Sequence, residues 1–216
     1  MFLESRYDIM QKILPLPLIL LILGVVGCGP SNVQTPPATH RPGSSNRPIT
    51  IAFALYDLPQ DKAAYRKANA ALAEAVSRFQ KLHPQITVKF TATTDPEMNP
   101  KIDPKPDLAM ITAKYLEKMV GDGGVEPLRA RLTGTWLRGF PYALLKHCKV
   151  ANRLFAIPWL ESEKPENSRL LIAFALSLRK TQAIELMKFL ITDPTATHAL
   201  AQTTGTKGAR KEVGAE

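Results

Sequence analysis

The chain of 216 residues contains 45% hydrophobic and 22% charged residues, ordinary values for a globular protein, and its length is sufficient for one domain with a single core. The formal net charge of +9 at pH 7 indicates solubility or weak attraction to anionic surfaces rather than a specific partner. Only two cysteines are present, which excludes a framework of several disulfides.

The first 27 residues have the features of an export signal. An apolar run from Ile13 to Val26 is followed by a small residue and a cysteine, Gly27-Cys28. The run is shorter than the roughly 20 residues that span a bilayer, which argues against the alternative of an uncleaved membrane anchor. The ending Val25-Val26-Gly27-Cys28 resembles the lipobox of bacterial lipoproteins. This resemblance implies that residues 1–27 are a cleaved signal peptide and that Cys28 is acylated, with palmitate an expected fatty acid. The protein would then be anchored in the cell membrane by lipid and face the periplasm or the exterior.

Residues 28–48 are predicted to form a tether. Prolines alternate there with Ser, Asn, Thr and Gly, and no apolar periodicity is present. Such a segment buries too little surface to fold and serves as a semi-extended spacer. If Cys28 is acylated, Cys148 has no disulfide partner in the chain, and we expect a buried, inert thiol.

The folded part begins with an apolar alternating run, Ile49–Leu55, which predicts a buried strand. Asp61 is expected to cap a helix whose apolar residues recur at helical spacing and which ends before Pro84. A second strand is predicted over Ile86–Phe90 and a third over Asp107–Ile111.

The rest of the chain continues this alternation. Thr112 is expected to cap a short helix that extends to Val120. Further strands are predicted over Leu154–Ile157 and Leu170–Leu178, the latter inserted in the sheet of the first three. Two helices complete the chain, from Thr181 to Thr192 and after an Asp193 cap with Pro194 at the first helical position. The pattern predicts an α/β domain over residues 49–204 with a mainly parallel sheet flanked by helices, and a flexible basic tail over residues 205–216.

Several of these segments carry short motifs in a fixed order. The helix ending Phe79-Gln80-Lys81-Leu82-His83-Pro84 and the strand after it resemble the opening of the extracellular solute-binding proteins of ABC importers, of the sugar-binding type. Four later segments resemble successive motifs of the same family: Pro106-Asp107-Leu108-Ala109, Gly124-Val125-Glu126-Pro127-Leu128, Asn152–Trp159 and Ala173–Ser177. The resemblance implies a periplasmic-binding-protein-like fold, a sugar or similar polar solute, an ABC permease as partner, no cofactor and no enzymatic activity.

The chain departs from this family at one place. Only the residues from Leu160 to Arg169 lie where the family has a second lobe, so we expect a single lobe. A single lobe cannot close around a ligand, and any affinity should therefore be weak. Two functions remain open: a solute-binding lipoprotein reduced to one lobe, or a structural or interaction lipoprotein that keeps the lobe as a scaffold without solute capture.

Ligands of open α/β sheets bind beyond the carboxyl ends of the strands. The candidate ligand-binding residues are those that follow the predicted strands: Tyr56, Asp57, Thr112, Lys114, Tyr115 and Trp159. Aromatic faces suit sugar rings, and a carboxylate accepts hydrogen bonds from hydroxyl groups. The alternative is local: Tyr56 and Trp159 pack on the domain and Asp57 caps a turn. If Trp159 and Asp57 face the strand ends, replacing either by alanine should leave the melting temperature nearly unchanged.

Other kinds of site have little support. The four histidines are scattered without ligand spacing, so no metal site is expected. Neither a phosphate-binding glycine loop nor a nucleophile elbow is present. The export signal disfavours nucleic acid as a partner. From Pro127 to Leu160 the chain has six basic residues and no acidic one, which is typical of a solvated helix face or, as an alternative, of a surface for anionic lipid headgroups.

Overall fold

The computed structural model describes residues 48–58, 60–92 and 106–210. The expected signal peptide, Cys28 and all but the last residue of the expected tether lie outside the described residues. Everything described belongs to one compact unit, Ser45–Glu216. None of the described helices has the length and apolar content needed to cross a bilayer.

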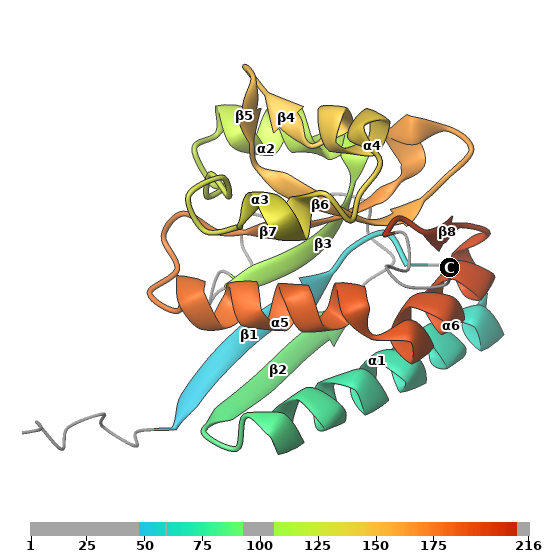
Figure 1. Ribbon diagram of the computed structural model, residues 1–216. Helices are drawn as coiled ribbons and strands as arrows, with labels where there is room; N and C mark the ends of the chain where they lie inside the picture. The colour runs from blue at the N-terminus through green and yellow to red at the C-terminus, as the bar shows by residue number, and fades with distance from the viewer. Residues whose placement is uncertain (1–47, 59, 93–105, 211–216) are drawn as a thin grey trace, which may run out of the picture. The chain divides into compact units, whose positions relative to one another are not determined.

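A six-stranded sheet forms the centre of this unit, with the strand order β2-β1-β3-β7-β6-β8 (Figure 1). Its strands are β1 (Ile49–Leu55), β2 (Ile86–Ala92), β3 (Leu108–Thr112), β6 (Ala156–Glu161), β7 (Arg169–Ala173) and β8 (Lys207–Gly208). β1 pairs in parallel with β2 and β3, whereas β7 is antiparallel to both β3 and β6. β8 is antiparallel to β6. Four of the six strands, β1, β2, β3 and β6, therefore run in one direction, and the predicted α/β lobe with its inserted late strand is confirmed.

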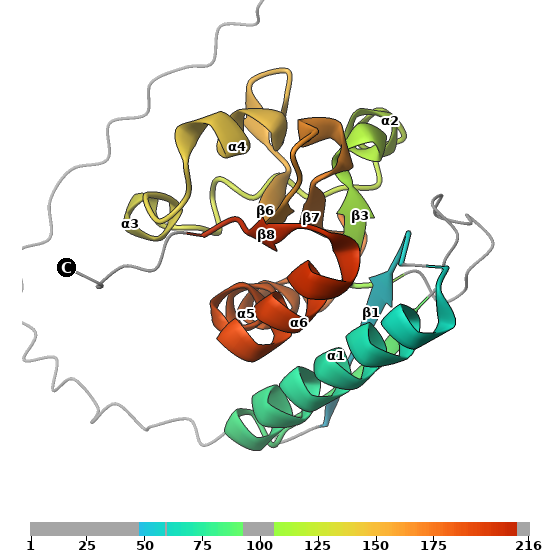
Figure 2. The same ribbon diagram turned by 90° about the vertical axis from the view of Figure 1, so that its right-hand side faces the viewer.

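Three helices cover one face of this sheet: α1 (Lys62–Leu82), α5 (Lys180–Thr192) and α6 (Pro194–Thr204) (Figure 2). The Asp61 carboxylate accepts a 2.7 Å hydrogen bond from the Ala64 amide, as the capping prediction requires. Asp193 caps α6 in the same way and also receives the Arg78 guanidinium at 2.8 Å. The Asp193 carboxylate thus caps the start of α6 and, through its ion pair with Arg78, links α6 to α1.

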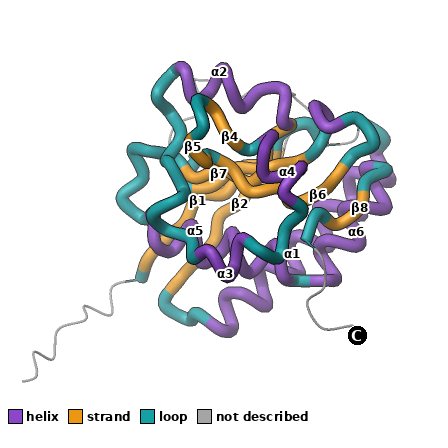
Figure 3. The backbone as a smooth tube through the Cα atoms, turned by 45° about the horizontal axis from the view of Figure 1, so that its top comes forward, coloured by secondary structure: helices purple, strands orange, loops and turns teal. Residues whose placement is uncertain are grey.

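Smaller elements lie around the rest of the sheet. They are the 3₁₀ turn η1 (Ala113–Tyr115), α2 (Leu116–Gly121), α3 (Gly134–Leu137), α4 (Tyr142–His147) and the hairpin of β4 (Lys149–Val150) and β5 (Arg153–Leu154). Of these, α3 lies beside α5, and α2, α4 and the short hairpin lie farther from it (Figure 3). A second 3₁₀ turn, η2 (Pro165–Asn167), lies between β6 and β7. Cys148 is fully buried beside α4, in agreement with the expected inert thiol.

Three sequence boundaries need correction. The strand expected to reach Leu178 ends at Ala173, because the next residues turn: the Ser177 amide bonds the Phe174 carbonyl, and Leu178 is 97% exposed. The strand expected over Leu154–Ile157 is divided between β5 and β6. The expected flexible tail is structured at its start, since β8 pairs with β6 and Ala209 is buried; residues 211–216 lie outside the described residues.

Candidate functional site

The parallel half of the sheet creates a point where neighbouring strands connect in opposite directions. From β1 the chain passes through α1 to β2 on one side, while β3 lies on the other side of β1. Loops that diverge in this way leave a crevice at the carboxyl ends of the strands, the usual ligand position in open α/β sheets. Asp57 follows β1 at this point, and Thr112 is the last residue of β3.

Three polar side chains from three strands meet there. The Thr112 hydroxyl donates a 2.6 Å hydrogen bond to Asp57 Oδ2. Arg169, the first residue of β7, donates from the same guanidinium nitrogen to Asp57 Oδ2 and to Thr112 Oγ1. The side chain of Arg169 is 13% exposed and that of Asp57 29% exposed. We call Asp57, Thr112 and Arg169 the strand-end cluster.

The backbone at Asp57 has an uncommon conformation. Its φ of 56° lies in the left-handed region, which Asp tolerates better than most residues that carry a Cβ. The preceding residue is fixed by a 3.1 Å hydrogen bond from the Tyr56 amide to the Met110 carbonyl of β3. The chain therefore turns sharply directly after the sheet, and this turn brings the Asp57 carboxylate to Thr112 and Arg169.

The register extends this polar edge across the sheet. Thr112 lies opposite Arg169, Arg169 opposite Leu160, and Glu161 opposite Lys207. The Lys207 ammonium lies 3.3 Å from the Glu161 carboxylate. At this edge, four described charged side chains form two ion pairs, Asp57 with Arg169 and Glu161 with Lys207. A ligand that binds there would therefore contact carboxylates that already have basic partners.

The two aromatic candidates lie inside the domain. Trp159 is 1% exposed, and its indole nitrogen donates a 3.0 Å hydrogen bond to Thr197 of α6. The register of β6 shifts between Pro158 and Leu160, and such an irregularity re-aims the side chain within it. Tyr56 is also 1% exposed. The expectation that these rings offer faces to a solute is therefore wrong for this structure, and the packing alternative accounts for both.

The remaining candidates fall into two groups. Lys114 and Tyr115 lie in η1, with the Lys114 ammonium 4.9 Å from the centre of the Tyr115 ring. They follow β3 as expected, but no described contact joins them to the strand-end cluster. Thr112 makes no side-chain cap for η1, contrary to expectation, because its hydroxyl bonds Asp57 instead.

Sequence reasoning missed Arg169. The segment from Leu160 to Arg169 reads as a linker, and nothing in its composition marks the arginine. The signal that could have found it is topological. A late strand inserted antiparallel beside β3 must begin where β3 ends, so its first residue lies opposite Thr112. The same pairing places Asp57 in an ion pair with Arg169, so we now expect its replacement to lower the melting temperature.

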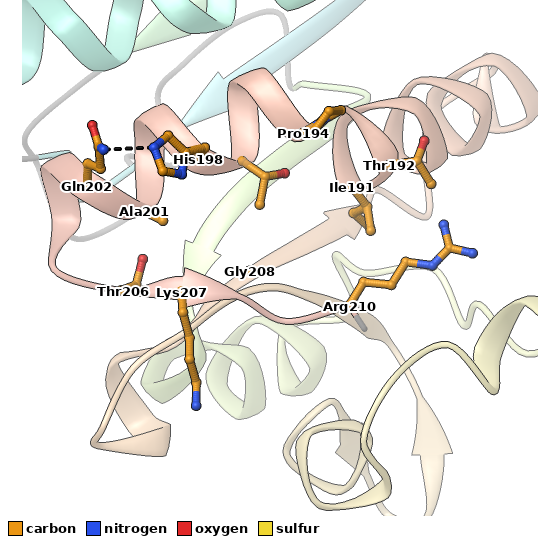
Figure 4. Close-up of a pocket in the computed structure, with 11 residues that line it drawn as sticks. Ile191, Thr192, Pro194, His198, Ala201, Gln202, Thr206, Lys207, Gly208 and Arg210 are labelled. Carbon is orange, nitrogen blue, oxygen red and sulfur yellow. Dashed lines mark hydrogen bonds between the residues drawn. The ribbon is translucent and has the colours of Figure 1, made fainter. Parts of the chain in front are cut away.

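A second recess lies between α6 and β8 (Figure 4). Its volume is about 850 Å³, and hydroxyl, amide, imidazole and basic side chains line it: Thr192, Thr197, His198, Gln202, Thr206, Lys207 and Arg210. The His198 ring and the Gln202 amide are 2.7 Å apart and bond each other. Nothing in the sequence indicated this recess, since its residues come from the end of α5, from α6 and from residues 206–210, which were expected to be a flexible tail. Within the described part of the chain, no group of three or more His, Cys, Asp or Glu side chains could hold a metal ion.

Comparison with known proteins identifies the fold. No protein-family model matches the sequence, and no curated protein matches it either. Among solved structures, a protein of Synechococcus sp. MITs9220 assigned provisionally to the oligosaccharide periplasmic-binding proteins is similar, with a TM-score of 0.61 and 11% identity over 75% of this chain and 78% of that one. A protein solved with acarbose has a TM-score of 0.54 and 11% identity, over 75% of this chain and 79% of that one. The maltotriose-binding protein of Thermus thermophilus matches more weakly, with a TM-score of 0.43 and 15% identity over 51% of this chain and 29% of that one. The first of these similarities confirms the expected fold, that of a periplasmic-binding-protein lobe, and the second structure shares it.

Proposed function

We propose that this chain is a single solute-binding lobe that takes up a sugar-like polar solute at the strand-end cluster. The observation that carries the proposal is the Asp57 carboxylate, held at the carboxyl ends of β1 and β3 by Thr112 and Arg169. Both of its described side-chain hydrogen bonds end on Oδ2, and within the described residues Oδ1 accepts none. Since a carboxylate has about four lone-pair positions and the Asp57 side chain is partly exposed, Oδ1 can accept hydrogen bonds from solute hydroxyls.

The affinity of such a site should be low. β6 and β7 are joined by a connection from Ser162 to Ser168, which is too short to hold a second lobe. Good pockets bury most of the ligand surface, and a single wall supplies only part of those contacts. Losing about 4 kcal/mol of contact energy weakens binding roughly a thousandfold, which brings a micromolar site to the millimolar range.

The export of the protein and its attachment to the membrane form part of the same proposal. The run from Ile13 to Val26 with Gly27-Cys28 supports export, cleavage after Gly27 and acylation of Cys28. The lobe would then lie outside the membrane on a tether of residues 28–48, near an ABC permease. On this proposal it acts by binding rather than by catalysis and without a cofactor; the similarity of its fold to that of a periplasmic-binding protein supports the binding role.

A second candidate function is a lipid-anchored scaffold without solute capture. The internal pairing of the edge charges favours it, because Asp57 and Glu161 already have basic partners. The burial of Trp159 favours it as well, since the ring is unavailable for stacking on a sugar.

Calorimetry on the full chain separates the two functions. Maltotriose and mannobiose are titrated into the wild type, Asp57→Asn and the matched control Asp122→Asn, which removes one exposed carboxylate beyond α2. Solute capture predicts millimolar binding that Asp57→Asn abolishes and Asp122→Asn preserves. Absence of binding by the wild type at saturating sugar would overturn the capture proposal and favour the scaffold. Sedimentation with and without sugar shows whether any tighter binding comes from a dimer that supplies a second wall.

A further inference from the structure

A groove among the smaller elements around the sheet has the chemistry of an anion site. It has a volume of about 740 Å³ and lies among the loop before α3, α4 and the β4–β5 hairpin. Its lining combines three basic residues with an exposed aromatic ring, an amide and aliphatic side chains: Arg129, Lys149, Arg153, Tyr142, Asn152, Pro127, Leu137, Leu145 and Leu154. We call it the cationic groove.

The positive charge of this groove is not balanced locally. Within the described part of the chain, Arg129, Lys149 and Arg153 form no ion pair with a carboxylate. The whole segment from Pro127 to Leu160 lacks acidic residues. Glu126, which directly precedes it, already pairs with Arg131 and Lys180 at 3.0 Å each. A recess lined by charges of one sign concentrates the field and attracts ions of the opposite sign.

A tight hairpin positions two of the cations. Lys149 pairs with Leu154 and Val150 with Arg153, so that only Ala151 and Asn152 form the turn. Both turn residues have positive φ, 46° and 61°, the arrangement of a type I′ hairpin. Lys149 and Arg153 are therefore carried on a short hairpin of defined geometry rather than on a long loop.

Aromatic rings orient the same two cations. The Lys149 ammonium lies 5.6 Å from the centre of the Tyr142 ring, and the Arg153 guanidinium lies 5.5 Å from that of Phe155. Tyr142 is 74% exposed at the start of α4. Its ring thus lines the groove beside an ammonium group without being part of the core, as expected for a contact surface rather than for packing.

We propose that the cationic groove binds a phosphate group, carried either by an anionic phospholipid headgroup or by a free phosphorylated sugar. The planar guanidinium groups of Arg129 and Arg153 match phosphate oxygens with paired donors, and Lys149 adds a point charge. The aliphatic side chains and the Tyr142 ring contact the carbon skeleton attached to the phosphate. This site is separate from the strand-end cluster and does not depend on solute capture there.

The reactivity of Lys149 measures occupancy of the groove. The full chain is reconstituted in phosphatidylcholine vesicles and acylated with an amine-reactive ester, and the labelling of each lysine is followed by mass spectrometry. One arm replaces the vesicles by an equimolar mixture of phosphatidylglycerol and phosphatidylcholine. The other arm adds glucose 6-phosphate, inorganic phosphate or, as the uncharged control, glucose. Lys81, exposed on α1, reports changes in labelling that do not involve the groove.

Two double variants with the same change in charge test whether the anion binds in the cationic groove. Arg129→Gln with Arg153→Gln removes the groove arginines, and Arg138→Gln with Lys146→Gln removes two exposed cations of the same segment outside the lining. All four side chains are exposed, so both variants should fold and melt as the wild type does.

We expect slower labelling of Lys149, with Lys81 unchanged, in one of the two arms. Protection by phosphatidylglycerol alone identifies the lipid headgroup, and protection by glucose 6-phosphate or inorganic phosphate identifies the free source. The groove variant should need about ten times more of the protecting anion for the same protection of Lys149, because it has lost charge-assisted contacts. The concentration that the control variant needs should stay within about twofold of the wild-type value. Absence of protection in both arms, or equal weakening by the two variants, would overturn the proposal.

Discussion

The pairing of Asp57 with Arg169 leads to a prediction about stability. Replacing Asp57 by Asn keeps the size of the side chain but removes the charge opposite a guanidinium that is only 13% exposed. Arg169 Nε is already buried without a hydrogen-bond partner among the described residues. The variant therefore leaves a largely enclosed guanidinium without an opposite charge beside it.

The size of the effect follows from the burial of the two groups. Removing one member of a fully buried ion pair costs about 3–5 kcal/mol, whereas an exposed pair contributes about 0–1 kcal/mol. With Asp57 at 29% exposure, an intermediate loss is expected, about 2 kcal/mol. For a domain of this size that lowers the melting temperature by about 4–8 °C.

A double-mutant cycle measures the interaction directly. Urea unfolding is followed for the wild type, Asp57→Asn, Arg169→Gln and the double variant. Because the two side chains are in contact, we expect a coupling energy of about 1–2 kcal/mol, with the double variant less destabilised than the sum of the single ones. Single effects that add without coupling would refute the structural role assigned to the pair and would free Asp57 for a solute.

Three further results are expected. Trp159→Ala should lose about 3–5 kcal/mol of stability through the cavity it leaves beside Thr197 of α6, measurable by urea unfolding, whereas Tyr142→Ala, at a site that is 74% exposed, should lose far less. Burial raises the pKa of the Cys148 thiol, so a thiol reagent at pH 8 should label Cys148 in the urea-unfolded protein and not in the native protein; fast labelling of Cys148 in the native protein, located by mass spectrometry, would contradict the burial. Cys28→Ala should abolish metabolic labelling with palmitate and either release the protein or leave it as an uncleaved precursor; undiminished labelling in that variant would exclude lipidation there.

The sequence was sufficient for those parts of the fold that depend on local patterns. The capped helix after Asp61, the strands at Ile49 and Ile86 and the Asp193-Pro194 helix start all arise from spacing and capping within one segment. The position of Asp57 and Thr112 at one edge of the sheet could be predicted for a similar reason, because residues that follow parallel strands meet at one edge.

Features that depend on pairing between distant segments could not be predicted from such local patterns. The burial of Trp159 requires its contact with Thr197 of α6, and the order of β8 requires β6 as a partner. The apolar character of Leu176 and Leu178 predicted strand residues. Among the described strands, however, none pairs with the chain beyond Ala173, and both leucines are exposed. Arg169 lies in the strand-end cluster because β7 pairs with β3 in a register that places it opposite Thr112. The residues next to Arg169 in the sequence do not indicate this register.

The position of β7 has a consequence for how the chain acquires its structure. β7 lies between β3 and β6, so one edge of β3 stays without its partner until residues 169–173 have been synthesised. Helix α1 packs against α6, which comes later still. Pairings between segments so far apart form slowly and expose a strand edge in the meantime. A nascent chain with this topology cannot complete its sheet before residues 169–173 have been synthesised. If the protein is exported as we propose, this late completion would favour the unfolded form that can cross a membrane.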